Sequence, residues 1–339
     1  MNPGLIITAD DYGLNPSCNN AIRNGVKAGI ITSVHVMMNL VSRQELDALR
    51  QVINASGNNC GIGLHLNTTW GPAMLQMPAS FKHTYGIHPH DPAVAYYTYK
   101  GLNLYKHAAT SMPIMRAELL AQFQSLVNYL GDAHKIDAIS SHQNIHFWSP
   151  SFLGIVNEMA KPAKIPVRSP LRWVTEEQVP RPPYYPYGKG KKGIGPLVAV
   201  GANKIGAAVS HPSTGNLLLS SLKPKRLHAY NKSVYTHGSG YTPRNATGHW
   251  FGQPSWKAME WILKTLPNMN SNADGYTTEL YMHLADSLIG RDHRWDYTQD
   301  KRLKEYLTIS HPDFIRAFHL LKNQLGIRHG SYRRVLRVV

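Results

Sequence analysis

The chain contains very little cysteine. Cys18 and Cys60 are the only two cysteines among its 339 residues. They form no C-x-x-C pair and are too few for a disulfide framework. The sequence therefore predicts a protein that works in a reducing compartment.

Long apolar runs are missing as well. The first apolar run, Leu5 to Thr8, is four residues long and leads directly to two aspartates. This start offers no hydrophobic region of the kind found in signal peptides. Nowhere does an apolar stretch approach the roughly 20 residues that span a bilayer. We therefore expect a soluble, cytoplasmic protein with no membrane span.

Acidic residues are scarce relative to basic ones. The chain has 20 Asp and Glu against 36 Lys and Arg, which gives a formal net charge of +16. Much of the excess lies in three segments, 189–192, 223–226 and 328–337. Such basicity suits a polyanionic partner, but it also serves as plain solubilising surface charge. Composition leaves both interpretations open.

Strand-like and helix-like segments alternate along much of the chain. The composition is 42% hydrophobic, which is enough for a sizeable core. The apolar patterns predict strands at 5–8, 33–38, 61–66, 137–140, 165–168 and 279–282, and helices at 15–28, 43–55, 114–130, 255–266 and 312–325, with another helix starting at 149–150. This order predicts an α/β fold with a mostly parallel sheet, arranged like a (β/α) barrel.

Two adjacent carboxylates, Asp10 and Asp11, follow the first predicted strand, and Gly13 allows a tight exit from it. Carboxylates at the end of a buried strand are costly to desolvate unless a metal ion, another cation or a shared proton compensates them. The alternative interpretation is a polar turn in which one aspartate caps the next helix.

Histidines follow three other strand-like runs. They are His65, the pair His142 and His146, and His283. Parallel α/β folds gather their active-site groups at the carboxyl ends of strands. One carboxylate and two imidazoles with an open position for water form a typical catalytic site for a divalent metal. Each histidine alone could be structural, but together these strand ends predict a site.

These segments resemble the YdjC-like carbohydrate deacetylase family. The matching residues keep the family's order from residue 4 to residue 332 and comprise 8–14, 20–39, 63–65, 141–146, 166–168, 251–252, 282–283 and 326–332. The chain departs from the family pattern at Gln143, Asn144 and Leu284, and in the loop 66–68. The resemblance implies one domain over 1–339 with a strand-end active site and long irregular insertions at about 76–113 and 175–250.

The resemblance also implies a set of metal ligands. Asp11, His65 and His142 would hold one divalent ion, and His146 is a further candidate, either as a ligand or as a group behind the ligands. The family favours Mg²⁺, while Zn²⁺, Mn²⁺, Co²⁺ and Ni²⁺ also suit a mixture of carboxylate and imidazole.

Three further residues are candidates for catalytic roles. Asp10 would act as the general base toward water. Arg168, at another predicted strand end, would pair with Asp10 and keep it ionised. His283 would protonate the leaving nitrogen or stabilise the oxyanion. The plainer alternatives are a surface arginine and a core histidine.

The function that these residues and the resemblance predict is metal-dependent removal of an N-acetyl group from an acetylated sugar or oligosaccharide. The alternatives are a metal-dependent hydrolase of a non-sugar amide or ester, and a basic protein that binds polyanions or nucleic acid. A catalytically inactive binding protein is disfavoured because candidates for base, ligands and acid are all present, and nucleic acid is the less favoured partner. We expect segment 180–250 to form a lid near the site, where its lysines would favour an anionic glycan, or a contact in a homo-oligomer.

Overall fold

The computed structural model describes the chain in several stretches. The described residues are 2–57, 59–68, 70–76, 87–88, 91–97, 108–142, 146, 150–168, 245–247, 254–266, 277–288 and 296–336. The insertion predicted at 175–250, with its proposed role as a lid or oligomer contact, lies outside them except for 245–247.

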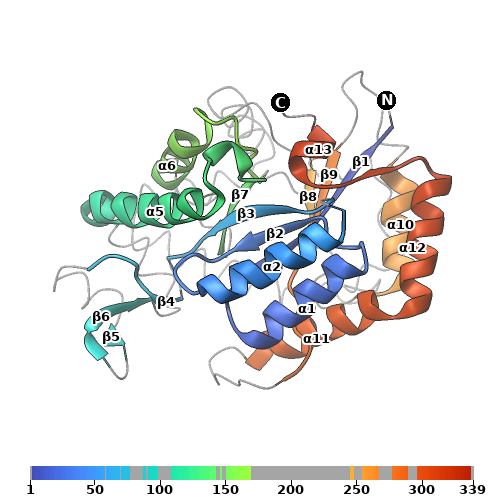
Figure 1. Cartoon of the computed structure of the whole chain (residues 1–339), viewed down its shortest axis with the longest axis horizontal. Helices are drawn as coiled ribbons and strands as arrows, with labels where there is room; N and C mark the ends of the chain where they lie inside the picture. Colours follow the sequence, from blue (N-terminus) through green and yellow to red (C-terminus); the bar gives the residue numbers. More distant parts are fainter. Residues whose placement is uncertain are drawn as a thin grey trace, which may run out of the picture.

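A parallel sheet occupies the centre of the molecule (Figure 1). Its strands are β1 (Gly4–Tyr12), β2 (Ser33–Val36), β3 (Gly61–Leu66), β7 (Ile139–Ser141), β8 (Asn245–Thr247), β9 (Thr277–Met282) and β10 (Arg328–His329). The strand order is β7-β3-β2-β1-β9-β8, and β10 pairs with the start of β1. All pairings between these described strands are parallel. The sheet curls into a half-barrel, which confirms the predicted barrel-like α/β fold.

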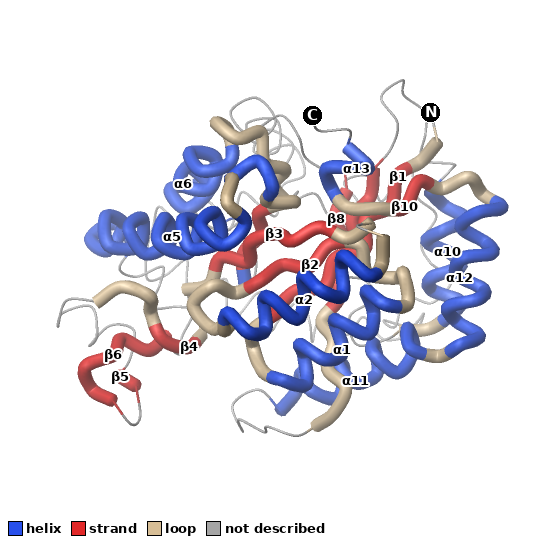
Figure 2. Tube along the Cα trace, viewed as in Figure 1, coloured by secondary structure: helices blue, strands red, loops and turns tan. Residues whose placement is uncertain are grey.

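Helices surround this sheet (Figure 2). They are α1 (Pro16–Lys27), α2 (Arg43–Ala55), α5 (Ala108–Leu130), α6 (Pro150–Ala160), α10 (Trp256–Thr265), α11 (Asp296–Ser310), α12 (Pro312–Gln324) and α13 (Tyr332–Leu336). Asn15 caps α1 by accepting a hydrogen bond from the Cys18 amide, and Pro16 occupies the first turn. Among the described residues, no helix is both long and apolar enough to cross a membrane.

Alternation along β1 separates an apolar face from a polar one. Leu5 and Ile7 point into the main core, which the surrounding helices share. Ile6 packs on the opposite face, in a small cluster with Ala138 and Tyr332. Because the alternation continues along the strand, Asp10 lies on the same face as Ile6, which we call the inner face of the sheet.

Parallel register extends this inner face across three more strands. His35 of β2 pairs with Gly63 of β3, and His65 of β3 pairs with Ser140 of β7. The inner face therefore carries buried polar side chains near the carboxyl ends of neighbouring strands, where parallel sheets place their functional groups.

Most predicted elements have their expected type, and 43–55 and 61–66 have their predicted bounds. The prediction of a strand at 165–168 is wrong. Val167 forms only an isolated bridge with Ile139, and Pro166 beside it has no N–H to extend a ladder. Helix α11 was not predicted from the sequence.

The insertion at 76–113 is less irregular than expected. Part of it forms β5 (Ile87–His88) and β6 (Asp91–Tyr97), which join β4 (Gly71–Pro72) in a small antiparallel sheet. Helix α5 also begins inside it, at Ala108.

Candidate metal centre

A local irregularity in β1 brings both aspartates to one site. Neighbouring residues of a regular strand point to opposite faces. Asp11, however, has φ 66°, in the left-handed region that non-glycine residues seldom adopt, and the register with β2 shifts between Ala9 and Tyr12. The aspartates thus converge within β1 and not beyond its end, where the sequence analysis placed them. Gly13, with φ 103°, provides the predicted tight exit.

Three predicted ligands meet around one carboxylate oxygen. Asp11 Oδ1 lies 3.2 Å from Nε2 of His65 and 2.9 Å from Nδ1 of His142. One ligand atom from each residue lies within 4.8 Å of the others, and all three residues are buried. The second ring nitrogen of His65 is hydrogen-bonded to Ser140 Oγ at 2.7 Å, as is usual for metal-binding histidines. The donor set therefore fits a divalent cation.

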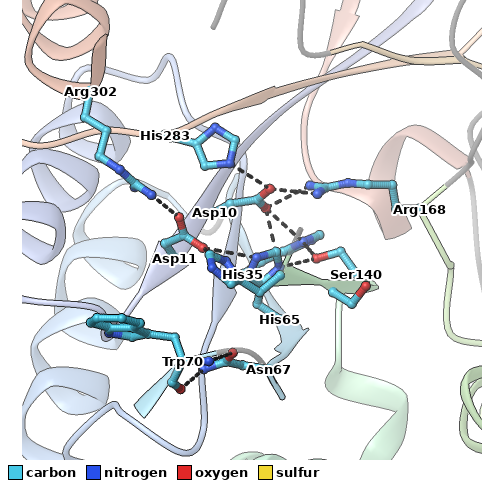
Figure 3. Close-up of polar contacts among 12 residues, drawn as sticks. Asp10, Asp11, His35, His65, Asn67, Trp70, Ser140, Arg168, His283 and Arg302 are labelled. Carbon is cyan, nitrogen blue, oxygen red and sulfur yellow. Dashed lines mark hydrogen bonds and ion pairs between the residues drawn. The ribbon is translucent and has the colours of Figure 1, made fainter. Parts of the chain in front are cut away.

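Arg168 forms a bidentate ion pair with Asp10 (Figure 3). Nη1 and Nη2 of the guanidinium donate to the two carboxylate oxygens at 2.7 and 2.8 Å. Nε and Nη2 also donate to Glu279 Oε1, at 2.8 and 2.7 Å. Burial alone would raise the pKa of Asp10, but Arg168 and His65 more than offset it and hold that pKa well below 3.8. Asp10 is therefore ionised at neutral pH.

Asp11 has its own arginine, Arg302 of α11. Its Nη2 donates to Asp11 Oδ2 at 2.6 Å, which leaves Oδ1 facing the two histidines. Burial would raise the pKa of Asp11, but His142 and Arg302 hold it well below its usual range. The two aspartates thus pair with different guanidiniums.

The two remaining predicted histidines occupy different places. His283 follows β9, and its Nε2 lies 3.8 Å from Asp10 Oδ2. Burial lowers the pKa of His283 to about 4. His146 instead has its Nδ1 hydrogen-bonded to Ser141 Oγ and belongs to neither group of ligand atoms among the described residues. The structure thus brings His283 to the aspartates and sets His146 beside Ser141.

A second possible ligand group consists of Asp10, His35 and His65. His35 Nδ1 lies 3.5 Å from Asp10 Oδ1. The Arg168 guanidinium already neutralises Asp10 and occupies both its oxygens. A second cation there would meet a positive charge at close range, so the Asp11 group is the better cation site.

Carboxylates and guanidiniums alternate among the described residues of the site. The carboxylates of Asp10, Asp11, Glu279 and Glu305 face the guanidiniums of Arg168 and Arg302, and all six residues are buried. Groups of opposite charge compensate one another at such short range, so removal of either arginine would leave a buried carboxylate without its partner.

Four residues of the site were not singled out from the sequence: His35, Ser140, Glu279 and Arg302. The first three alternate with other inner-face residues on their strands, so the period of two, applied across the predicted strands, could have found them. Arg302 gave no signal, because its helix was not predicted and it lies 291 positions from Asp11.

Comparisons with known proteins agree with this architecture. A carbohydrate deacetylase of Oceanobacillus iheyensis is 27% identical over 169 residues, which cover 48% of this chain and 63% of the relative. A chitooligosaccharide deacetylase of Proteus mirabilis is 28% identical over 167 residues, 48% of this chain and 58% of the relative. The matched region thus spans about three fifths of these relatives.

The fold has a solved counterpart. The crystal structure of an Enterococcus faecalis protein named for cellobiose-phosphate cleavage superposes with a TM-score of 0.60 at 17% identity, covering 98% of this chain and 99% of that one. The sequence profile of the YdjC-like protein family matches residues 4–319. The chain therefore belongs to the YdjC-like family.

Proposed function

We propose that this chain is a metal-dependent carbohydrate deacetylase that hydrolyses the N-acetyl group of an acetylated sugar or oligosaccharide. The observation that carries the proposal is the Asp11, His65 and His142 group lying beside an arginine-clamped second carboxylate, Asp10. The names of the YdjC-like relatives support the reaction and the substrate class.

In this proposal Asp11, His65 and His142 hold a divalent ion, Mg²⁺ by family resemblance or Zn²⁺, Mn²⁺, Co²⁺ or Ni²⁺. Such an ion, when bound, polarises an acyl oxygen and lowers the pKa of bound water to about 7. Arg302 fixes the Asp11 carboxylate by its bond to Oδ2, so that Oδ1 stays directed at the histidines.

Asp10 serves as the proton acceptor for the attacking water. A carboxylate has about four lone-pair positions, and the Arg168 fork uses two of them, so positions remain for the water proton. The lowered pKa makes Asp10 a weak base. For the same reason, the proton passes on readily to the more basic leaving nitrogen as the C–N bond breaks and acetate forms.

His283 completes the proposed set. With a pKa of about 4 it is uncharged at neutral pH, so it donates one hydrogen bond as a neutral imidazole. This favours stabilisation of the developing oxyanion over direct protonation of the leaving group. Its Nε2 lies 3.8 Å from Asp10 Oδ2, which places this imidazole beside the proposed base.

The test is acetate release by the full chain loaded with each metal in turn. N-acetylated sugars and oligosaccharides should release acetate, and non-sugar amides and esters should not. Asp10→Asn should keep the metal but lose about 10²-fold or more in turnover, as expected for a general base. Asp11→Asn should lose the metal too, while the exposed Asp313→Asn should behave like the native chain. Near-normal turnover in Asp10→Asn would refute the assignment of the base.

A further inference from the structure

One hydroxyl group connects His65 to a histidine outside the proposed ligand set. Ser140 Oγ lies 2.7 Å from Nδ1 of His65 and 2.5 Å from Nδ1 of His35 (Figure 3). All three side chains are buried. The two imidazoles therefore share a single serine.

A serine hydroxyl carries one proton and donates to only one of two neighbouring imidazoles. His65 directs Nε2 toward Asp11, so a His65 that binds metal through Nε2 carries its own proton on Nδ1. Ser140 Oγ must then accept from His65. Its own proton is then available for donation to Nδ1 of His35.

The imidazole ring of His35 is closely packed by its neighbours. A Cβ on Gly63, its partner on β3, would lie 2.4 Å from Cδ2 of His35, so only glycine leaves room there. Tyr332 stacks on the ring, with centroids 5.8 Å apart and planes at 28°. His35 is fully buried and cannot turn to water.

Asp10 is the competing partner of His35. Its Oδ1 lies 3.5 Å from Nδ1, and it would favour a proton on that nitrogen. Asp10 Oδ1 already accepts a hydrogen bond from Arg168 Nη2 at 2.8 Å. Ser140 Oγ lies closer to His35, at 2.5 Å from Nδ1. Ser140 Oγ is therefore the nearer partner of His35 Nδ1, and Asp10 is the more distant one.

We propose that His35 is a positioning residue which, through Ser140, fixes the tautomer of His65 that binds metal. This inference rests on the proposed function, because it takes His65 as a ligand. In the metal-loaded protein the hydrogen bonds run from His65 Nδ1–H to Ser140 Oγ and from Ser140 Oγ–H to His35 Nδ1. Without an acceptor at position 35, the Ser140 hydroxyl donates its hydrogen bond to His65 Nδ1. His65 then carries its proton on Nε2, which is the atom that should bind the metal.

The first test reads the tautomers in the unaltered full chain loaded with Zn²⁺. Long-range ¹H–¹⁵N correlation spectra of ¹⁵N-histidine protein distinguish protonated from unprotonated ring nitrogens. The signals of His35 and His65 are assigned from those missing in His35→Asn and His65→Ala. The expected pattern is Nε2–H on His35 and Nδ1–H on His65. A proton on His35 Nδ1 would overturn the inference.

The second test compares two variants of similar shape. His35→Asn offers an amide oxygen close to the former Nδ1, whereas His35→Leu offers no acceptor. Zn²⁺ affinity, measured by competition with a chromophoric chelator, should fall about 10- to 100-fold in His35→Leu and recover in His35→Asn. Equal affinities in the two variants would contradict the proposed role. Thermal unfolding of each metal-free variant reports any simple loss of structure.

A double-mutant cycle then asks whether His35 acts through Ser140. Ser140→Ala alone should weaken Zn²⁺ binding, and adding His35→Leu should weaken it little further. Fully additive losses would exclude the serine as intermediary. If His65→Ala keeps its Zn²⁺, the proposed metal site itself fails. If His65→Ala loses Zn²⁺ while His35→Leu binds normally, only the present inference fails.

Discussion

Arg168 lies between two buried carboxylates of the site. It is 1% exposed and bonds both Asp10 and Glu279. Arg168→Met would leave two buried carboxylates without their cation, and the loss in the free energy of unfolding should be about 3–5 kcal/mol. Urea denaturation at neutral pH measures it through the shift of the midpoint.

The matched control for this prediction is Arg116→Met. Arg116 pairs with Glu158, but both side chains are 49% exposed. Exposed ion pairs contribute little to the free energy of unfolding, so Arg116→Met should cost much less than Arg168→Met. Similar losses for the two variants would mean that burial of the Arg168 cluster is not what makes it important.

His329 is a buried titratable residue away from the candidate site. Burial lowers its pKa to about 3, and Lys322 adds to the effect. In the unfolded chain the imidazole of His329 binds a proton near pH 6.5. Between about pH 6.5 and pH 3 the unfolded state therefore binds more protons than the folded state. The contribution of His329 to stability is therefore lost as the pH falls through this window.

His329→Gln should remove that contribution. Between pH 6.5 and pH 3, the free energy of unfolding of this variant should fall less than that of the native chain, by on the order of 4 kcal/mol. Urea titrations at several pH values check this. His311→Gln, at a side chain 62% exposed, serves as the control for replacing a histidine at the surface. Parallel slopes in all three proteins would rule out His329 as a source of acid sensitivity.

At the scale of elements, the exit of β1 depends on Gly13. It has φ 103°, and a Cβ there would lie 2.8 Å from Cβ of Val41. Gly57 also has a positive φ, 73°, but nothing lies within 4 Å of its position. Gly57→Ala should cost about 1 kcal/mol for the backbone alone. Gly13→Ala should cost about 1–3 kcal/mol more because of the added contact, and thermal or urea unfolding compares them.

Helix α11 is tied to the site by Arg302. Arg302→Met should destabilise the metal-free protein by about 3 kcal/mol, since it leaves Asp11 buried without its cation. Zn²⁺ would supply a replacement charge, so the loss should be smaller when the metal is bound. Unfolding of this variant and the native chain in Zn²⁺ and in EDTA measures the difference. An equal loss under both conditions would argue against metal binding next to Asp11.

At the scale of the whole molecule, metal binding should couple to stability. A cation that binds only the folded chain at 100 times its dissociation constant stabilises it by about 2.7 kcal/mol. Zn²⁺ should therefore raise the melting temperature by several degrees. His65→Ala should abolish the rise, and the exposed His134→Ala should keep it. A rise that survives in His65→Ala would place the metal elsewhere.

The chain carries a formal net charge of +16. The basic segments 189–192 and 223–226 lie outside the described residues. An anionic substrate, a lid over the site and a homo-oligomer thus remain predictions from the sequence.

The sequence by itself determined the elements and the candidate residues. Apolar periodicity located most strands and helices because alternation with period 2 or 3.6 is a local property. The pair Asp10 and Asp11 and the histidines after the strands pointed to the carboxyl edge of a parallel sheet. That edge collects side chains by topology, so their proximity followed from the fold class.

Only the tertiary structure decided how these residues are partnered. The left-handed backbone at Asp11 turns both carboxylates to one side, although the sequence pattern placed them beyond the strand. Arg302 and His35 reach the site from elements whose contacts depend on packing between distant segments. Local sequence carries no record of such contacts, because the charge and hydrogen-bond partners of a buried group are set by whatever the fold places beside it.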